Sequence, residues 1–279
     1  MAALASNLVQ EAQAGRKPST DLFVGYANTF APLATNNVAE QVDWSWAPNL
    51  RNPALIAPNG VGVIIQDGLA GITYNTNKVK GDQVPKTLQD LLKPAFKGHV
   101  ASTPSAADWD YIASDEMWGD QKTFDYLTKL SSQISGLIRC AEIERVASGE
   151  FDAFALNCSP NVTIQEQKKG APVDFTIPTD AATNALLYAA IPKGAAHPNM
   201  AKLFIDNLVS HEGQAVMYDN TFEDSHLVPG SKTATYIDQV QASGTKVLSV
   251  DLQWVLAQGD KASARTKRAA GILAGAVKK

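Results

Sequence analysis

The stretch VASGEFDAFALNCSPNV, Val146 to Val162, contains the pattern that decides the fold. A glycine ends a helix-like segment that runs from about Cys140 to Ser148, and Asp152 to Leu156 then reads as a strand before a polar turn. Another strand is expected just upstream, from Ile134 to Ile138. Strand, helix and strand in this order are typical of a mostly parallel sheet covered by helices.

Composition favours two such α/β lobes, because a chain of 279 residues with 45% hydrophobic content is larger than most single domains. We place the first lobe at 1–76 and 184–279 and the second at 77–183, since the pattern changes from strand-like to helix-like near Val84. The strands expected before that change are Leu22 to Gly25, Val61 to Gln66 and Gly71 to Thr76.

Charge and hydropathy argue against two classes of partner. The formal net charge is −4, whereas a nucleic-acid site usually has a clustered basic face. No run approaches 18 apolar residues, so no membrane-spanning helix is expected. The basic residues near the C-terminus are interpreted as the solvated face of a terminal helix: Lys261, Arg265, Lys267, Arg268, Lys278 and Lys279.

A further helix is predicted from Asn199 to Val209. Its Met200, Leu203, Phe204 and Leu208 recur at helical spacing, so these four side chains are expected to face the core. They are not interpreted as a cofactor-binding motif, and no cofactor is expected.

Several segments, taken in order, resemble one family: the type II solute-binding proteins of ABC importers, near the branch that binds ferric iron, thiamine and phosphonates. The resemblance covers about residues 8 to 230. Each segment alone is a weak signal, but together and in this order they are specific. The matching segments are Glu11 to Gly15 with Asp21 to Ala27, Gly71 to Lys78, Pro85 to Gly98, Arg145 to Ala153, and Ile191 to Gln214.

The resemblance implies a two-lobed α/β fold of the periplasmic-binding-protein kind, with a ligand cleft between lobes that close by hinge bending. It implies capture of a small polar or anionic organic solute, of the carboxylate or phosphonate type, for delivery to a membrane permease in the periplasm without chemistry. The N-terminus lacks the charged-then-apolar pattern of a secretory signal, which a mature chain would have lost.

Two departures from the family qualify that expectation. Ferric-binding members resemble one another in two adjacent tyrosines after the strand that here ends at Leu156, and this chain has Asn157-Cys158-Ser159 there. No metal site is therefore expected, and a ferric-iron binder is the lesser alternative. Members also carry a strand, a helix and a strand before the part that matches Glu11 to Gly15. Without them, Leu22 to Gly25 is expected to expose an edge or to cover it by self-association.

Candidate ligand-binding residues follow from the resemblance and from strand ends. On the first lobe they are Tyr26, Asn28 and Thr29, and at the second crossing Asn184. On the second lobe they are Ser102, Thr103, Trp109, Arg139, Asn157 and Ser159. Each has a structural alternative: the hydroxyls can cap a helix, the tryptophan can belong to the core, the arginine can be solvated, and asparagines are common in turns.

The two cysteines leave three alternatives open. Cys140 and Cys158 are expected at one rim of the second lobe, where a disulfide would suit an oxidising compartment. Two separate buried thiols are equally consistent with the sequence. The third alternative is a hydrolase-like enzyme that uses Cys158 as nucleophile, although no histidine lies in a recognisable partner pattern.

Overall fold

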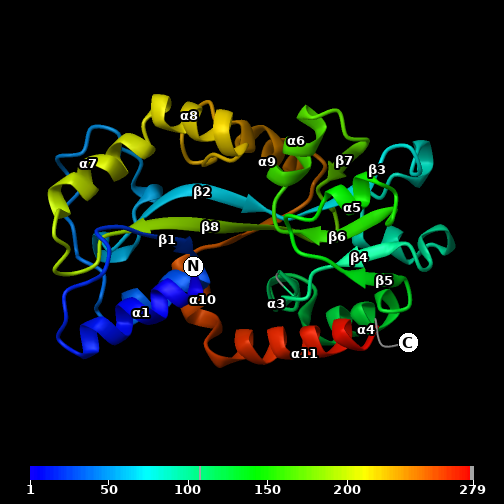
Figure 1. The fold of residues 1–279 in the computed structure, drawn as a ribbon, viewed down its shortest axis with the longest axis horizontal. Helices are drawn as coiled ribbons and strands as arrows, with labels where there is room; N and C mark the ends of the chain where they lie inside the picture. Colours follow the sequence, from blue (N-terminus) through cyan, green and yellow to red (C-terminus); the bar gives the residue numbers. More distant parts are fainter. Residues whose placement is uncertain (107, 277–279) are drawn as a thin grey trace. The chain divides into compact units, whose positions relative to one another are not determined.

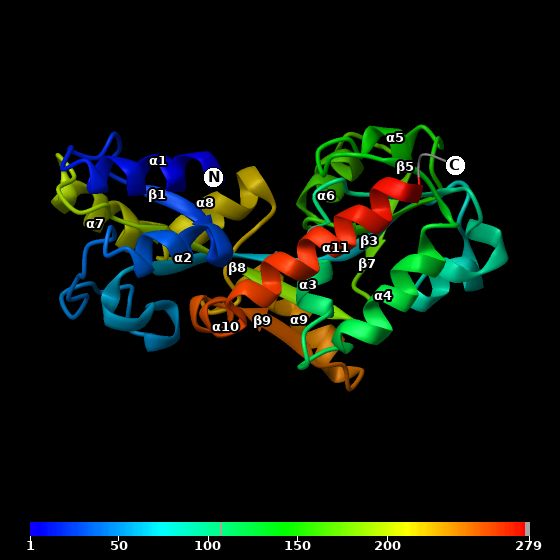
Figure 2. The same cartoon turned by 90° about the horizontal axis from the view of Figure 1, so that it is seen from below.

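The computed structural model describes residues 1–106 and 108–276, which form two compact units of mixed α/β structure (Figures 1 and 2). The first contains 1–68, 185–235 and 250–257. The second contains 69–184, 236–249 and the chain from Gln258 to the end of the described residues. The segments 236–249 and from 258 onward group with the second unit, whereas the sequence analysis assigned them to the first lobe.

One sheet has four strands in the order β1-β8-β2, with β9 also paired to β8. β1 and nearly all of β2 lie in the first unit, β8 crosses the division, and nearly all of β9 lies in the second unit. β1 is antiparallel to β8, with Phe23 opposite Ala190. The strands are β1 (Phe23–Tyr26), β2 (Val63–Leu69), β8 (Ala182–Ala190) and β9 (Val247–Val250). β1 ends this order, and the expected self-association through its edge stays a prediction.

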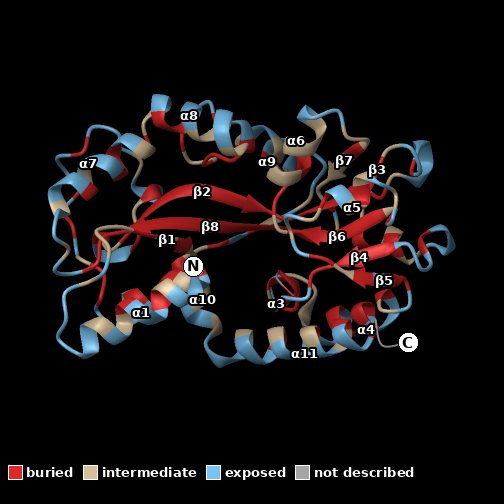
Figure 3. Cartoon of the chain, in the orientation of Figure 1, coloured by how far each residue is buried: buried red, intermediate tan, exposed pale blue. Residues whose placement is uncertain are grey.

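Helices and turns complete the first unit. Its α-helices are α1 (Ala2–Gln13), α2 (Ala27–Thr35), α7 (Pro198–Leu208), α8 (His211–Thr221) and α10 (Leu252–Gln258), and its 3-10 turns are η1 (Pro53–Leu55) and η2 (Pro58–Gly60). α9 (Lys232–Ala242) crosses the division between the units. β2 and β8 are buried along their whole length (Figure 3), and apolar residues do not alternate with polar ones in either sequence. The polar residues they contain, Gln66, Asp67, Thr183 and Asn184, are buried as well.

The second unit contains a five-stranded sheet in the order β5-β4-β6-β3-β7. β4 is parallel to both β5 and β6, while β3 is antiparallel to β6 and β7. The strands are β3 (Gly71–Asn75), β4 (Val100–Ser102), β5 (Ile134–Leu137), β6 (Ala153–Asn157) and β7 (Val173–Thr176). The strands predicted at Ile134 to Ile138 and Asp152 to Leu156 are confirmed to within one residue.

The helices of this unit are α3 (Trp109–Ile112), α4 (Gly119–Leu130), α5 (Glu144–Ala147), α6 (Asn161–Lys168) and α11 (Asp260–Ala276), with 3-10 turns η3 (Gly81–Gln83), η4 (Leu88–Leu92) and η5 (Pro94–Phe96). A capping box opens η4, where the Thr87 hydroxyl accepts from the Asp90 N–H and the Asp90 carboxylate accepts from the Thr87 N–H. The proline-led segment after Val84 therefore forms 3-10 turns.

The basic C-terminal helix is not solvated throughout. Arg265 is buried, and its Nε donates to Asp120 Oδ1 at 2.7 Å while its Nη1 donates to Gln258 Oε1 at 2.8 Å. Ala269 and Leu273 follow at intervals of four and are also buried, so one face of α11 packs on the second unit. The interpretation of this tail as a solvated face is therefore wrong for Arg265. Lys278 and Lys279 lie outside the described residues.

The predicted core face of α7 is also wrong. Met200, Leu203 and Phe204 are 66%, 54% and 50% exposed, and Leu208 is only partly buried. Ala201 and Ile205 face the core instead, so the buried stripe is offset by one residue from the stripe of large apolar side chains. Spacing alone could not locate the buried face, since both stripes have helical periodicity.

Two neighbouring residues of α7 test this assignment. We expect Ile205→Ala to lower the free energy of unfolding by about 2–5 kcal/mol, because Ile205 is completely buried in the hydrophobic core of the first unit. Phe204→Ala should change it by less than about 0.5 kcal/mol, since the phenyl ring is half exposed. Urea denaturation followed by circular dichroism measures both. A larger loss for Phe204→Ala would contradict the assignment.

Candidate functional site

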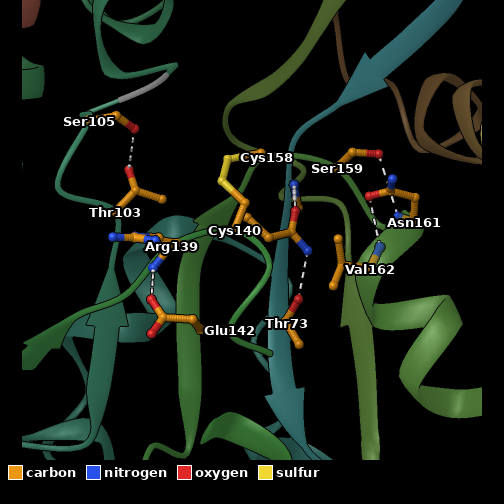
Figure 4. The surroundings of a disulfide bond; sticks show 12 residues. Thr73, Thr103, Ser105, Arg139, Cys140, Glu142, Cys158, Ser159, Asn161 and Val162 are labelled. Carbon is orange, nitrogen blue, oxygen red and sulfur yellow. Dashed lines mark hydrogen bonds between the residues drawn. A yellow bond between two sulfur atoms is a disulfide. The ribbon is translucent and has the colours of Figure 1, made fainter. Parts of the chain in front are cut away.

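Polar side chains gather where three strands of the second unit end. β5, β4 and β6 are adjacent and parallel, so their carboxyl ends meet at one edge of the sheet. In open α/β sheets this edge is where ligands bind. The sequence-predicted residues at this edge are Ser102 and Thr103 at the end of β4, Arg139 and Cys140 after β5, and Asn157, Cys158 and Ser159 at the end of β6. Figure 4 labels Thr103, Arg139, Cys140, Cys158 and Ser159 among them.

A disulfide joins Cys140 to Cys158, with their Cα atoms 5.7 Å apart. The pairing expected as one of three alternatives is thereby confirmed. Because the sulfur of Cys158 is bonded, it cannot act as a thiolate nucleophile, and the alternative of an enzyme that uses Cys158 has no support. The helix expected to begin near Cys140 begins only at Glu144, since the preceding residues form a turn.

Both polar atoms of the Asn157 side chain form hydrogen bonds within the protein. Its Oδ1 accepts from the Gly71 N–H at 2.8 Å, and its Nδ2 donates to Thr73 Oγ1 at 2.6 Å. The amide therefore fastens β6 to β3 while it is almost completely buried. A Cβ at position 71 would lie 3.0 Å from the Thr176 carbonyl oxygen and 3.3 Å from Asn157 Oδ1, so glycine permits this close approach. Its role as a ligand contact stays a prediction beside this structural role.

The backbone is strained at the same edge. Leu156 has φ 49°, beside a register shift between β3 and β6, and Ala106 and Asp108 in the loop after β4 have φ 52° and 69°. Within the described part of the second unit, these three are the non-glycine residues with positive φ. Such strain tends to concentrate at functional sites, where the surrounding structure holds residues in unfavourable conformations.

Ser102 and Trp109 are fully buried near the strand ends. Among the described residues, neither the Ser102 hydroxyl nor the Trp109 indole N–H has a hydrogen-bond partner. Thr103, also buried, accepts at 3.3 Å from the hydroxyl of Ser105. Buried hydroxyls without partners are uncommon and need an explanation, and a missing ligand is one.

Arg139 and Ser159 flank the disulfide. Figure 4 shows Thr103 and Arg139 on one side of the bridge and Ser159 with Asn161 on the other. The Arg139 side chain is exposed, while its backbone N–H donates to Glu142 Oε2 at 2.6 Å and fixes the turn. The Ser159 hydroxyl accepts weakly, at 3.5 Å, from the Asn161 N–H at the start of α6. The edge thus offers a guanidinium and hydroxyl groups, which suit carboxylate or phosphonate oxygens.

Two acidic residues beside this edge have altered acidity. Burial, reinforced by the neighbouring Asp110 charge, raises the pKa of Asp108 to about 8. Burial also raises the pKa of Asp110 to about 6, against the opposing effects of backbone hydrogen bonds and Arg265. The sequence analysis did not select Asp110, because no local pattern distinguishes a buried aspartate from a solvated one.

The remaining candidates lie elsewhere. Tyr26, Asn28 and Thr29 open α2 in the first unit, where the Thr29 hydroxyl donates to the Tyr26 carbonyl at 2.9 Å and Asn28 is exposed. Asn184 is fully buried in β8. Ligand contact by these four stays a prediction.

The pockets of the two units lie away from the predicted site residues. Four pockets of about 200–520 Å³ within the individual units are lined by residues other than the predicted ones. Across 1–106 and 108–276, no three histidine, cysteine or acidic side chains are grouped so as to hold a metal ion. No helix in that part of the chain has both the length and the apolar character needed to cross a membrane.

Comparisons with known proteins agree on one family. The family model for bacterial extracellular solute-binding proteins matches residues 17–245. The Fe(3+)-binding periplasmic protein of Serratia marcescens is 24% identical over 284 residues, which cover 88% of this chain and 78% of the relative. An uncharacterized protein of Haemophilus influenzae is 29% identical over 194 residues, 67% of this chain, and the chain spans about half (54%) of its length.

A solved structure gives the same result for the fold. The substrate binding protein of an ABC transporter from Agrobacterium tumefaciens superposes with a TM-score of 0.79 at 18% identity, covering 97% of this chain and 84% of that chain. The predicted α/β fold class is thereby confirmed.

The acidity of Asp108 predicts a pH dependence of stability. Because its folded-state pKa of about 8 lies above the unfolded value near 3.9, its contribution is full below about pH 4 and is lost as the pH rises through 8. Asp108→Asn removes the ionisation and tolerates the left-handed backbone. We expect the variant to exceed the parent in stability by on the order of a few kcal/mol at pH 8, with little difference at pH 4.

Thermal and urea denaturation at both pH values measure the effect. Asp238→Asn, on the exposed surface of α9, is the control and should follow the parent throughout. Equal stability of Asp108→Asn and the parent at pH 8 would contradict the assigned pKa.

Proposed function

The chain belongs to the bacterial extracellular solute-binding protein family, and from this premise we propose that it captures a small polar or anionic organic solute of the carboxylate or phosphonate type. It then delivers the solute to the permease subunits of an ABC importer. The proposal includes the mode implied by the family resemblance, in which lobes close around the solute, and a periplasmic location. The family is one of solute-binding proteins and the Serratia marcescens relative is a binding protein, which supports capture without chemistry.

One observation carries the choice of solute: the buried, unpartnered Ser102 hydroxyl at an edge that also contains Thr103 and Arg139. A buried hydroxyl without a partner is destabilising by about 1–3 kcal/mol, and a partner that arrives with the ligand would remove that cost. Neutral donors and one guanidinium can surround an oxyanion, and the first turn of α6 after Ser159 adds a partial positive charge. The Asn161 and Val162 N–H groups of that turn already donate to Ser159 Oγ and Asn161 Oδ1.

Ferric iron fits this edge poorly, although one relative is described as an Fe(3+)-binding protein. The positions at the end of β6 that the family resemblance assigns to iron-binding tyrosines contain Asn157, Cys158 and Ser159, and Ser159 offers only a neutral hydroxyl. The Asn157 amide is committed to Gly71 and Thr73, and the Cys158 sulfur is committed to the disulfide. Neither offers the hard anionic oxygen that a ferric ion prefers.

Arg139→Ala tests the proposal. The purified protein is first screened for thermal stabilisation by succinate, methylphosphonate, glucose and spermidine, since a solute at a hundred times its Kd adds roughly 2.7 kcal/mol of stability. We expect an anion to stabilise the protein most, and Arg139→Ala to weaken its binding about 10–100-fold in calorimetry, because a charge-assisted hydrogen bond is lost.

Arg51→Ala removes an exposed arginine of the first unit and is the matched control, with binding expected within twofold of the parent. Stabilisation by glucose or spermidine alone, or unchanged anion binding by Arg139→Ala, would contradict the anionic solute class.

A further inference from the structure

The disulfide does not connect neighbouring strands. Cys140 follows β5 and Cys158 follows β6, and β4 lies between these two strands in the sheet. Strands that flank a third are about 9.6 Å apart, twice the spacing of one pair. The two Cα atoms are nevertheless only 5.7 Å apart, so the loops after β5 and β6 converge past the end of β4. The bridge therefore shapes loops and does not reinforce a ladder of strand hydrogen bonds.

Candidate ligand residues are the direct sequence neighbours of both cysteines, and another ends the strand between them. Arg139 immediately precedes one cysteine, Ser159 immediately follows the other, and Ser102 ends the strand between them. The loop after β5 is tied to β4 through the Ile138 N–H, which donates to the Ser102 carbonyl at 2.9 Å. Both cysteines are half-buried, so a reductant can reach them.

Other contacts fix one end of the bridge more firmly than the other. The Asn157 amide anchors the residue before Cys158 to β3. Cys140 instead lies in a turn whose own hydrogen bonds, from Arg139 N–H to the partly solvated Glu142 carboxylate and from Glu142 N–H to the Arg139 carbonyl, are local to the turn. Without the bridge, the turn at 139–142 would lose its covalent connection to that anchored strand end. The affected guanidinium is the one that the proposed function places on the anion.

We propose that Cys140 and Cys158 are positioning residues for solute binding: their disulfide holds the loops after β5 and β6 in the binding arrangement, so affinity depends on its oxidation state. The inference rests on the proposed function for the identity of the site. Loops that are already ordered before binding improve affinity, because binding then does not carry the entropic cost of ordering them. The bridge closes a loop with a sequence separation of 18, and this closure restricts the conformations open to the chain when it is not folded.

Two measurements test the inference. The first is hydrogen exchange of the ligand-free protein, oxidised and reduced in place. Reduction should speed exchange at least about fivefold in segments 102–105, 138–143 and 157–161, while α4 in the same unit stays protected. A disulfide that only stabilised the unit as a whole would speed exchange in α4 as well. Unchanged exchange in the three segments, or equal acceleration in α4, overturns the proposal.

The second measurement is calorimetric affinity for succinate and methylphosphonate. Reduced protein and the Cys140→Ser/Cys158→Ser double variant should each bind at least about tenfold more weakly than the oxidised parent. Leu130→Ala, in the core of the second unit, is the matched control: it should lower the melting temperature comparably but leave affinity within twofold. Equal affinity of oxidised and reduced protein overturns the proposal and leaves the proposed function intact.

Oxidised protein that binds neither anion contradicts the proposed solute class instead. The exchange measurement then decides whether the bridge organises the three loop segments, so failure of the site's assignment and failure of the inference remain distinguishable.

Discussion

The parallel pairing of β4 with both β5 and β6 is the constraint on which the candidate site depends. Neighbouring parallel strands end at the same edge of a sheet. The residues that follow these three strands therefore lie close together, although the strands are far apart in the sequence. Hydroxyls, a guanidinium and two cysteines meet there because of strand direction. Helices then cover the faces of the sheet and leave this edge to carry polar groups.

The sequence predicted the features that depend on local pattern. Strand segments around Ile134 and Ala153 were located from runs of apolar residues bounded by turns, and the order of elements was sufficient for the family and fold class. The pairing of Cys140 with Cys158 was one of several alternatives at that stage, since it depends on which strands lie side by side.

The sequence could not show which of these side chains are buried and which are exposed. In α7, two stripes with the same helical period compete, and tertiary packing selected Ala201 and Ile205 over the larger Leu203 and Phe204. Arg265 was expected in solvent, but its guanidinium is buried and donates hydrogen bonds to two side chains. Asp120 is distant in the sequence, and Gln258 lies before the break that precedes α11. The raised pKa of Asp108 likewise results from burial and from the charge of Asp110, and no sequence motif indicates either.

The amide clamp of Asn157 has an evolutionary consequence. Its two hydrogen bonds connect position 157 to Gly71 and Thr73, and Thr73 Oγ1 in turn lies 2.7 Å from Thr163 Oγ1. A tyrosine at 157 would leave the Gly71 N–H without its acceptor and would need space now filled by β3. A phenolate at that position would therefore cost the contact between β6 and β3 unless the partner positions changed with it. Positions 71, 73 and 157 are far apart in the sequence but are coupled through these hydrogen bonds, so a substitution at one of them constrains the residues that the other two can tolerate.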